Sequence, residues 1–131
     1  MDYKTGKVDA KKLTFKAENL DELFQKPEHS QLIQLLCYVY LYQNSNHPLL
    51  IPTQEFQCGI IAFQELFKQN DEYICYAQID KDKSLTNKIL HVFEVHLKQL
   101  FSSILDTKTA FCQTNEAENC IYCDYKNICG K

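Results

Sequence analysis

Apolar residues along the chain recur at helical spacing in two long stretches. Residues 28–43 form the first predicted helix, whose core positions are Leu32, Leu35, Leu36, Val39 and Tyr40. Residues 84–106 form the second, because an apolar residue returns every three or four positions and Ser84 suits an N-cap. A shorter helix is predicted to start near Asn19, with an acidic residue three positions on, and to end before Pro27.

Short stretches rich in aromatic and β-branched residues predict strands. Residues 57–63 and 73–79 are separated by a polar turn at 69–71, which favours two adjacent antiparallel strands. Residues 1–7 are a third candidate strand, and residues 13–15 form a short extended piece. Residues 44–54 contain two prolines and are predicted to form a loop. The chain is expected to form a single α/β domain over residues 1–131.

Composition narrows the range of partners. A chain of 131 residues with 45% hydrophobic content can bury a core. The formal net charge is −3 and all 14 basic residues are lysines, so any contact with DNA should use point charges and have weak sequence preference. No apolar run is long enough to span a bilayer and no signal peptide is evident, so we expect a cytoplasmic protein without membrane contact.

The first strand carries a pair of opposite charges. Asp2 and Lys4 are two positions apart, so both side chains project from the same face while Tyr3 faces the other way. A carboxylate can hold Mg²⁺ or Mn²⁺, and an ammonium can stabilise charge on a phosphate. The alternative is an ion pair exposed on an edge strand.

A second polar pair lies on the first long helix. Gln34 and Tyr38 are four residues apart and are therefore neighbours on the helix surface. Taken alone, this spacing indicates a polar flank with a tyrosine that covers the core.

The C-terminal tail contains clustered cysteines. Cys120, Cys123 and Cys129 follow the spacing C-x2-C-x5-C, which suits three ligands of a 4Fe-4S cluster or of Zn²⁺. Cys112 could supply a fourth ligand, and the alternative is three reduced cysteines without metal. Cys58 and Cys75 lie inside predicted strands and are expected to be buried. The remaining metal candidates, His91 and His96, are five residues apart on a helix, a spacing that does not bring them together.

The string DYKTGK, the later QLLCY and the cysteine-rich tail resemble, in this order, the RecB-like branch of the PD-(D/E)XK nuclease superfamily. The resemblance implies a restriction-endonuclease-like α/β core with a small mixed sheet flanked by helices. It implies Asp2 as a ligand of Mg²⁺ or Mn²⁺ and Lys4 as a catalytic residue. It also implies Gln34 and Tyr38 as a supporting pair that positions a phosphate or a metal-bound water. AddB-type and CRISPR-associated members bind an iron–sulfur cluster, which implies Cys120, Cys123 and Cys129 as its ligands.

The same resemblance implies a DNA exonuclease module of a helicase-type recombination and repair protein. In the family a further carboxylate and a fourth cysteine come from earlier segments. We therefore expect the chain to be the C-terminal part of the nuclease domain, with residues 107–131 as a metal-binding tail and upstream segments of the same protein as partners. Alone, it should be inactive. Two other hypotheses are a catalytically dead nuclease-like module that binds DNA or a partner, and a zinc-stabilised interaction domain without nuclease ancestry.

Overall fold

The computed structural model describes residues 1–45, 55–67, 73–110, 112, 114 and 117–130. The chain divides into two compact units, Met1–Lys98 and Gln99–Lys131. All of the strands and the buried core belong to the first unit. That the chain forms one domain with a tail at 107–131 stays a prediction.

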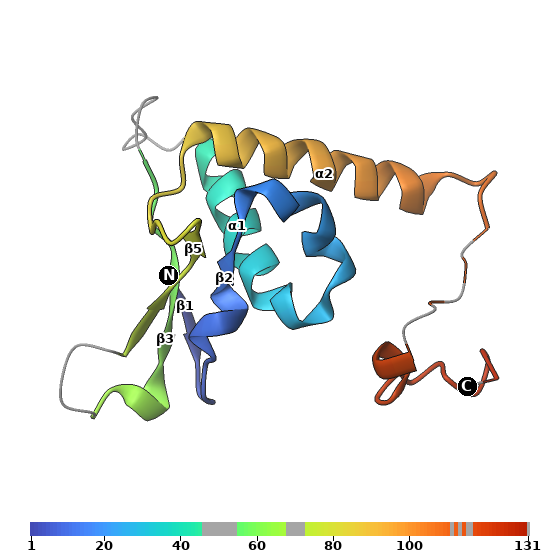
Figure 1. The fold of residues 1–131 in the computed structure, drawn as a ribbon, viewed down its shortest axis with the longest axis horizontal. Helices are drawn as coiled ribbons and strands as arrows, with labels where there is room; N and C mark the ends of the chain where they lie inside the picture. The colour runs from blue at the N-terminus through green and yellow to red at the C-terminus, as the bar shows by residue number, and fades with distance from the viewer. Residues whose placement is uncertain (46–54, 68–72, 111, 113, 115–116, 131) are drawn as a thin grey trace. The chain divides into compact units, whose positions relative to one another are not determined.

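The first unit contains a mixed sheet of three short strands. Its order is β1 (Asp2–Lys4), β3 (Gly59–Ala62) and β4 (Ile74–Tyr76), with β1 parallel to β3 and β3 antiparallel to β4. A separate parallel pair joins β2 (Thr14–Phe15) to β5 (Gln78–Ile79). Figure 1 shows helices beside this small mixed sheet, which confirms the predicted fold class.

The predicted antiparallel pair of strands is also confirmed, with one difference. The second predicted strand divides at Ala77, whose N–H donates to the carbonyl oxygen of Cys58, and β5 then pairs with β2 instead of β3. Gly59 allows β3 and β4 to approach closely, because a Cβ at this position would lie 2.7 Å from the carbonyl oxygen of Cys75. The predicted polar turn at 69–71 and most of the predicted loop at 44–54 lie outside the described residues.

Helix α1 (Ser30–Gln43) packs against the core through its predicted apolar face. Leu32, Leu35, Leu36 and Val39 are buried, and Tyr40 is half-buried. The helix begins two residues later than predicted, because a 3₁₀-helix, η3 (Pro27–His29), comes before it. Proline at the first position of a helical turn costs no hydrogen bond, so this turn starts readily at Pro27.

Two further 3₁₀-helices, η1 (Ala10–Leu13) and η2 (Ala17–Gln25), pack around α1. The helix predicted to start near Asn19 is present, although its first helical turn begins two residues earlier. The helical segment begins at Ala17, and Asn19 lies inside it with φ −111° and ψ 18°, at a kink between two helical pieces. The N–H of Ala17 donates to Asp80 Oδ1, so a contact 63 residues away along the chain fixes this start. A fourth 3₁₀-helix, η4 (Phe63–Glu65), follows β3.

Helix α2 (Asn87–Leu105) begins after Thr86, not at Ser84 as predicted. Thr86 Oγ1 accepts a hydrogen bond from the N–H of Ile89, the geometry of an N-cap. Within the first unit, Phe93 is fully buried and stacks on Phe24, with ring centroids 5.6 Å apart. The apolar side chains of Phe101 and Ile104, which belong to the second unit, are exposed.

The second unit contains the end of α2 and one more 3₁₀-helix, η5 (Ala117–Cys120). Turns follow η5 up to Gly130, and none of the described residues in this unit is buried. Among all described residues, no helix combines the length and apolarity needed to cross a membrane.

Candidate active site

Strand β1 places two opposite charges on the same side. Asp2 and Lys4 are half-buried, whereas Tyr3 between them is 60% exposed. Pairing with β3 fixes this register, since Asp2 lies opposite Ile60 and Lys4 opposite Ala62. Lys4 Nζ lies 3.1 Å from Asp2 Oδ2. The predicted strand and the shared orientation of the two charges are confirmed.

Helix α1 brings two more predicted residues to this pair. Lys4 Nζ donates a hydrogen bond of 3.4 Å to Gln34 Oε1, and Gln34 Nε2 donates one of 2.7 Å to the hydroxyl oxygen of Tyr38. Leu35, which follows Gln34, is buried in the core and holds the helix in this orientation. Asp2, Lys4, Gln34 and Tyr38 therefore form a continuous polar cluster, although they lie up to 36 positions apart.

The surroundings of the ion pair distinguish it from an ordinary surface contact. The side chains of Lys4 and Asp2 are only 34% and 18% exposed. Because Lys4 also bonds to Gln34, its ammonium is held by two partners from two elements. The alternative of an ion pair lying open in solvent does not describe this arrangement.

One atom of the polar cluster is suited to bind a cation. Asp2 Oδ2 is buried and accepts no hydrogen bond, because its contact with Lys4 has the distance of an ion pair without hydrogen-bond geometry. A buried carboxylate oxygen in this state fits Mg²⁺ or Mn²⁺, which prefer oxygen ligands. Across the described residues, no group of three or more His, Cys, Asp or Glu side chains is arranged to hold a metal ion. Asp2 thus fits as one ligand of an incomplete site.

The structure does not gather the cysteines of the tail into a metal-binding group. Cys120 ends η5, Cys123 follows a two-residue turn, and Cys129 lies within the next turn segment, residues 124–130. The N–H of Cys123 donates to the carbonyl oxygen of Cys120 at 3.2 Å, so local backbone turns organise this segment. Cys120 and Cys123 are half-buried, while Cys129 and the candidate fourth ligand Cys112 are exposed. Their role as metal ligands stays a prediction.

The cysteines of the first unit are different in character. Cys58 is buried, and burial raises the pKa of its thiol to about 11. Burial also raises the pKa of Cys75, which is half-buried beside the core, so the expectation of full burial holds only for Cys58. His91 is exposed, with Nδ1 3.8 Å from Glu94, as expected for a surface residue.

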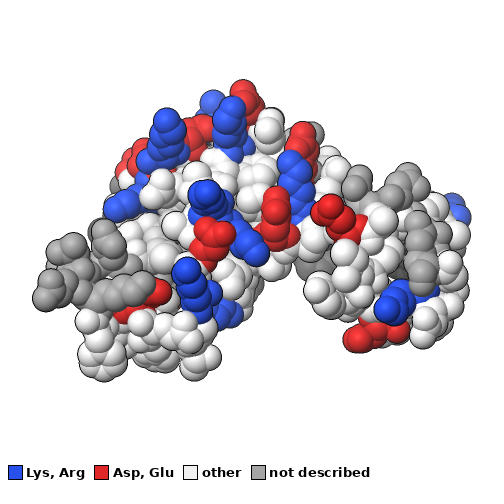
Figure 2. Space-filling model, turned by 60° about the horizontal axis from the view of Figure 1, so that its bottom comes forward, with Lys and Arg blue, Asp and Glu red and all other residues white. Residues whose placement is uncertain are grey.

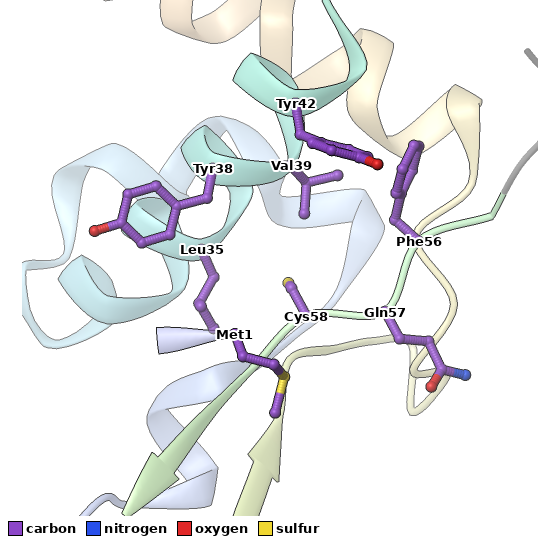
Figure 3. A pocket seen from close by; sticks show the side chains of 8 residues that line it. All are labelled: Met1, Leu35, Tyr38, Val39, Tyr42, Phe56, Gln57 and Cys58. Carbon is purple, nitrogen blue, oxygen red and sulfur yellow. The ribbon is translucent and has the colours of Figure 1, made fainter. Parts of the chain in front are cut away.

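A pocket beside the polar cluster contains aromatic residues that the sequence did not single out as functional. Tyr42 lines this pocket together with Tyr38 and Phe56 (Figure 3). Tyr38 and Tyr42 are four residues apart on α1 and so share a face. The spacing of the two tyrosines could have indicated this shared face from the sequence. The position of Phe56, in the segment before β3, could not be predicted, because no local pattern brings it to α1.

Charge is distributed without a strong basic surface on the face seen in Figure 2. Lysine and acidic side chains lie interspersed there. This mixture of charges agrees with the formal net charge of −3.

Comparison with known proteins gives one match. A family model described as the PD-(D/E)XK nuclease superfamily matches residues 1–130, and therefore includes all four residues of the polar cluster and the three tail cysteines. No curated protein and no solved structure matches the chain. The match overturns the hypothesis of an interaction domain without nuclease ancestry. Because it spans nearly the whole sequence, the chain belongs to the PD-(D/E)XK nuclease superfamily.

Proposed function

We propose that this chain is a DNA exonuclease module that hydrolyses phosphodiester bonds with Mg²⁺ or Mn²⁺, within a helicase-type recombination and repair protein. Membership of the superfamily indicates nuclease-type chemistry on phosphodiester bonds. The observation that carries the proposal is the chain of contacts from Asp2 through Lys4 and Gln34 to Tyr38.

Each residue of the polar cluster has a role in this proposal. Asp2 holds the divalent ion through Oδ2, which accepts no hydrogen bond. When bound, the ion supplies Lewis-acid stabilisation of the charge on the phosphate. Lys4 places its ammonium beside the same phosphate oxygens and orients the attacking water. Gln34 and Tyr38 hold Lys4 in position, because the amide accepts from the ammonium and in turn donates to the phenol.

The metal site needs more ligands than this cluster contains. Phosphoryl chemistry with divalent ions uses several oxygen ligands, and Asp2 is the carboxylate that the described cluster provides. We propose that further carboxylates come from other segments of the same protein. The 131-residue chain alone is then expected to be inactive.

We further propose that Cys120, Cys123 and Cys129 bind a structural 4Fe-4S cluster. The spacing of three soft thiolates carries this part of the proposal, and zinc is the alternative ion for the same ligands. The half-buried thiols of Cys120 and Cys123 lie within one turn of each other along the backbone. Neither the iron–sulfur cluster nor zinc would take part in hydrolysis.

The test of catalysis compares two lysines in the full-length protein. Lys4→Ala should lower hydrolysis of end-labelled DNA about 10²- to 10³-fold, the usual cost of removing one group that stabilises transition-state charge. Lys7→Ala is the matched control, because Lys7 is an exposed lysine three positions away. Full activity in Lys4→Ala would overturn the proposal, and DNA binding without any metal-dependent hydrolysis would favour the catalytically dead module.

The metal ligand has its own test. Mn²⁺ binding, followed by electron paramagnetic resonance, should weaken in Asp2→Asn and stay unchanged in Asp9→Asn. Asp9 is an N-cap whose Oδ1 accepts from the N–H of Lys11, and asparagine can replace it there. Equal Mn²⁺ binding by both variants would remove Asp2 from the metal site.

A further inference from the structure

A pocket of about 370 Å³ opens next to the polar cluster. Four of its lining residues come from α1 and three from the segment that leads into β3. This volume falls at the lower end of the range of small-ligand sites, about 300 to 1,000 Å³. It can therefore accept one flat heterocycle rather than a larger ligand.

The side chains that line the pocket carry no charge, and three of them are aromatic. Tyr38 lies at one end, and Tyr42 and Phe56 meet at the other in an edge-to-face contact, with ring centroids 6.0 Å apart (Figure 3). Val39 and Cys58 lie between these ends, and the Cys58 thiol is neutral because burial raises its pKa to about 11. A charged ligand would find no counter-ion among these side chains, whereas a flat, neutral ring would find faces to stack on.

The pocket and the polar cluster share a boundary. Tyr38 contributes its ring to the pocket, and its hydroxyl, which accepts from Gln34, is directed away from the other lining side chains (Figure 3). Met1, which also lines the pocket, directly precedes Asp2. A phosphate at Asp2 and Lys4 would thus lie next to an aromatic pocket, the arrangement that one nucleotide needs for its phosphate and its base.

We propose that this pocket binds an unpaired nucleobase of the DNA strand whose phosphate lies at Asp2 and Lys4. This inference rests on the proposed function and specifies the class of DNA that the nuclease would act on. A base in a duplex is stacked and paired, so it can enter only after leaving the helix. The substrate class is therefore single-stranded DNA, held by stacking on aromatic side chains without reading of the sequence.

The first test uses the full-length protein and fluorescent oligothymidines in EDTA, with one abasic residue moved through each position in turn. Binding is measured by fluorescence anisotropy. Loss of the base at one position should weaken binding about 5- to 150-fold, the effect of removing one stacked base, and other positions should change little. A blunt duplex of the same length should bind more weakly than the single strand.

The second test assigns that base to the pocket. Tyr42→Leu keeps an apolar lining but removes an aromatic face, so it should reduce the difference between intact and abasic strands. Tyr42→Phe should preserve the difference. Tyr3→Leu is the control for loss of a tyrosine outside the pocket, since Tyr3 is exposed on the opposite side of β1.

The outcomes separate this inference from the proposed function. If DNA binds but no abasic position matters, or if Tyr42→Leu retains the full difference, the pocket is not a base site while the nuclease proposal stands. If no oligonucleotide binds at all, both proposals are overturned.

Discussion

The two compact units differ in how their backbones hold the chemically interesting side chains. In the unit Met1–Lys98, the polar cluster projects from β1 and α1, and both elements have core residues as immediate neighbours: Ile60 opposite Asp2, and Leu35 after Gln34. In the unit Gln99–Lys131, the cysteines project from η5 and from turns, and no described residue there is buried. The first motif is positioned by packing, whereas the described part of the second unit offers no buried side chains to position the second motif.

This difference has a physical consequence for how each motif forms. Hydrophobic burial offsets the entropy of ordering the backbone, so the Asp2 to Tyr38 contacts can form before any ligand arrives. A segment without buried apolar side chains needs another source of favourable free energy to offset this entropy cost. Binding of a metal by thiolates is one such source. We therefore expect the polar cluster to be preorganised and the cysteine segment to depend on its ligand.

Metal removal should show the largest contrast between the units. Structural metal in small cysteine sites contributes about 10–16 kcal/mol of apparent free energy, so chelation should abolish hydrogen-exchange protection in residues 117–130. Protection of α1 and β3 should not change. Iron and acid-labile sulfide, measured on chain purified without oxygen, identify the ligand.

Substitution at Cys123 provides the matched control for that experiment. Cys123→Ser should lose the bound metal, whereas Cys75→Ala, in β4, should retain it. Protected amides in residues 117–130 of the metal-free chain would contradict the proposed difference between the units, because the segment would then fold without a ligand.

Two phenylalanines on α2, one in each unit, allow the two units to be compared by the free energy of unfolding. Phe93 is 0% exposed and Phe101 is 54% exposed, although both lie on the same helix. Phe93→Ala should lower the free energy of unfolding by about 3–5 kcal/mol, through lost burial and the cavity left behind. Phe101→Ala should change it by no more than about 0.5 kcal/mol. Urea unfolding followed by circular dichroism measures both, and equal effects would mean that Phe101 is buried in solution.

Cysteines in the first unit should respond to pH in a way that reveals their burial. Burial raises the pKa of Cys58 from 9.0 to about 11, so folding favours the neutral thiol. This contribution is fully present below pH 9 and is lost as the pH rises from 9 to 11. The free energy of unfolding should fall by up to about 2–3 kcal/mol across that window.

Cys58→Ala isolates this effect from the other groups that titrate in alkali. Its unfolding free energy should fall less steeply between pH 9 and 11 than that of the unaltered chain, whatever its stability at pH 7. Parallel curves for the two proteins would show that the Cys58 thiol is accessible to solvent.

The sequence predicted those features that depend on local periodicity. Alternation placed Asp2 and Lys4 on one side of β1, and helical spacing placed Gln34 next to Tyr38. The contact between Lys4 and Gln34 joins residues 30 positions apart, and no periodicity encodes it. The family resemblance assigned Lys4, Gln34 and Tyr38 to one site without giving their contacts, while the pocket formed by Tyr42 and Phe56 required the tertiary structure.

Element boundaries were the least predictable features because tertiary contacts override local preference. Ser84 and Thr86 are both suitable N-cap residues near the start of α2. The N–H of Leu85 donates to the carbonyl oxygen of Phe56 at 2.7 Å, and its carbonyl accepts from Phe56, which holds this residue in an extended bridge. The helix can therefore begin only after Leu85, so Thr86 becomes the cap.

The capping assignment yields the smallest expected effect. Thr86→Ala removes the side-chain oxygen that accepts from the N–H of Ile89 at 3.4 Å, and should lower the free energy of unfolding by about 1 kcal/mol. Ser84→Ala should have little effect, since the backbone N–H of Ser84, which the substitution keeps, donates to Asp82 Oδ1. Thermal unfolding of both variants measures the difference. If Ser84→Ala were the more destabilising change, α2 would start two residues earlier in solution, and the bridge between Phe56 and Leu85 would not hold its first turn.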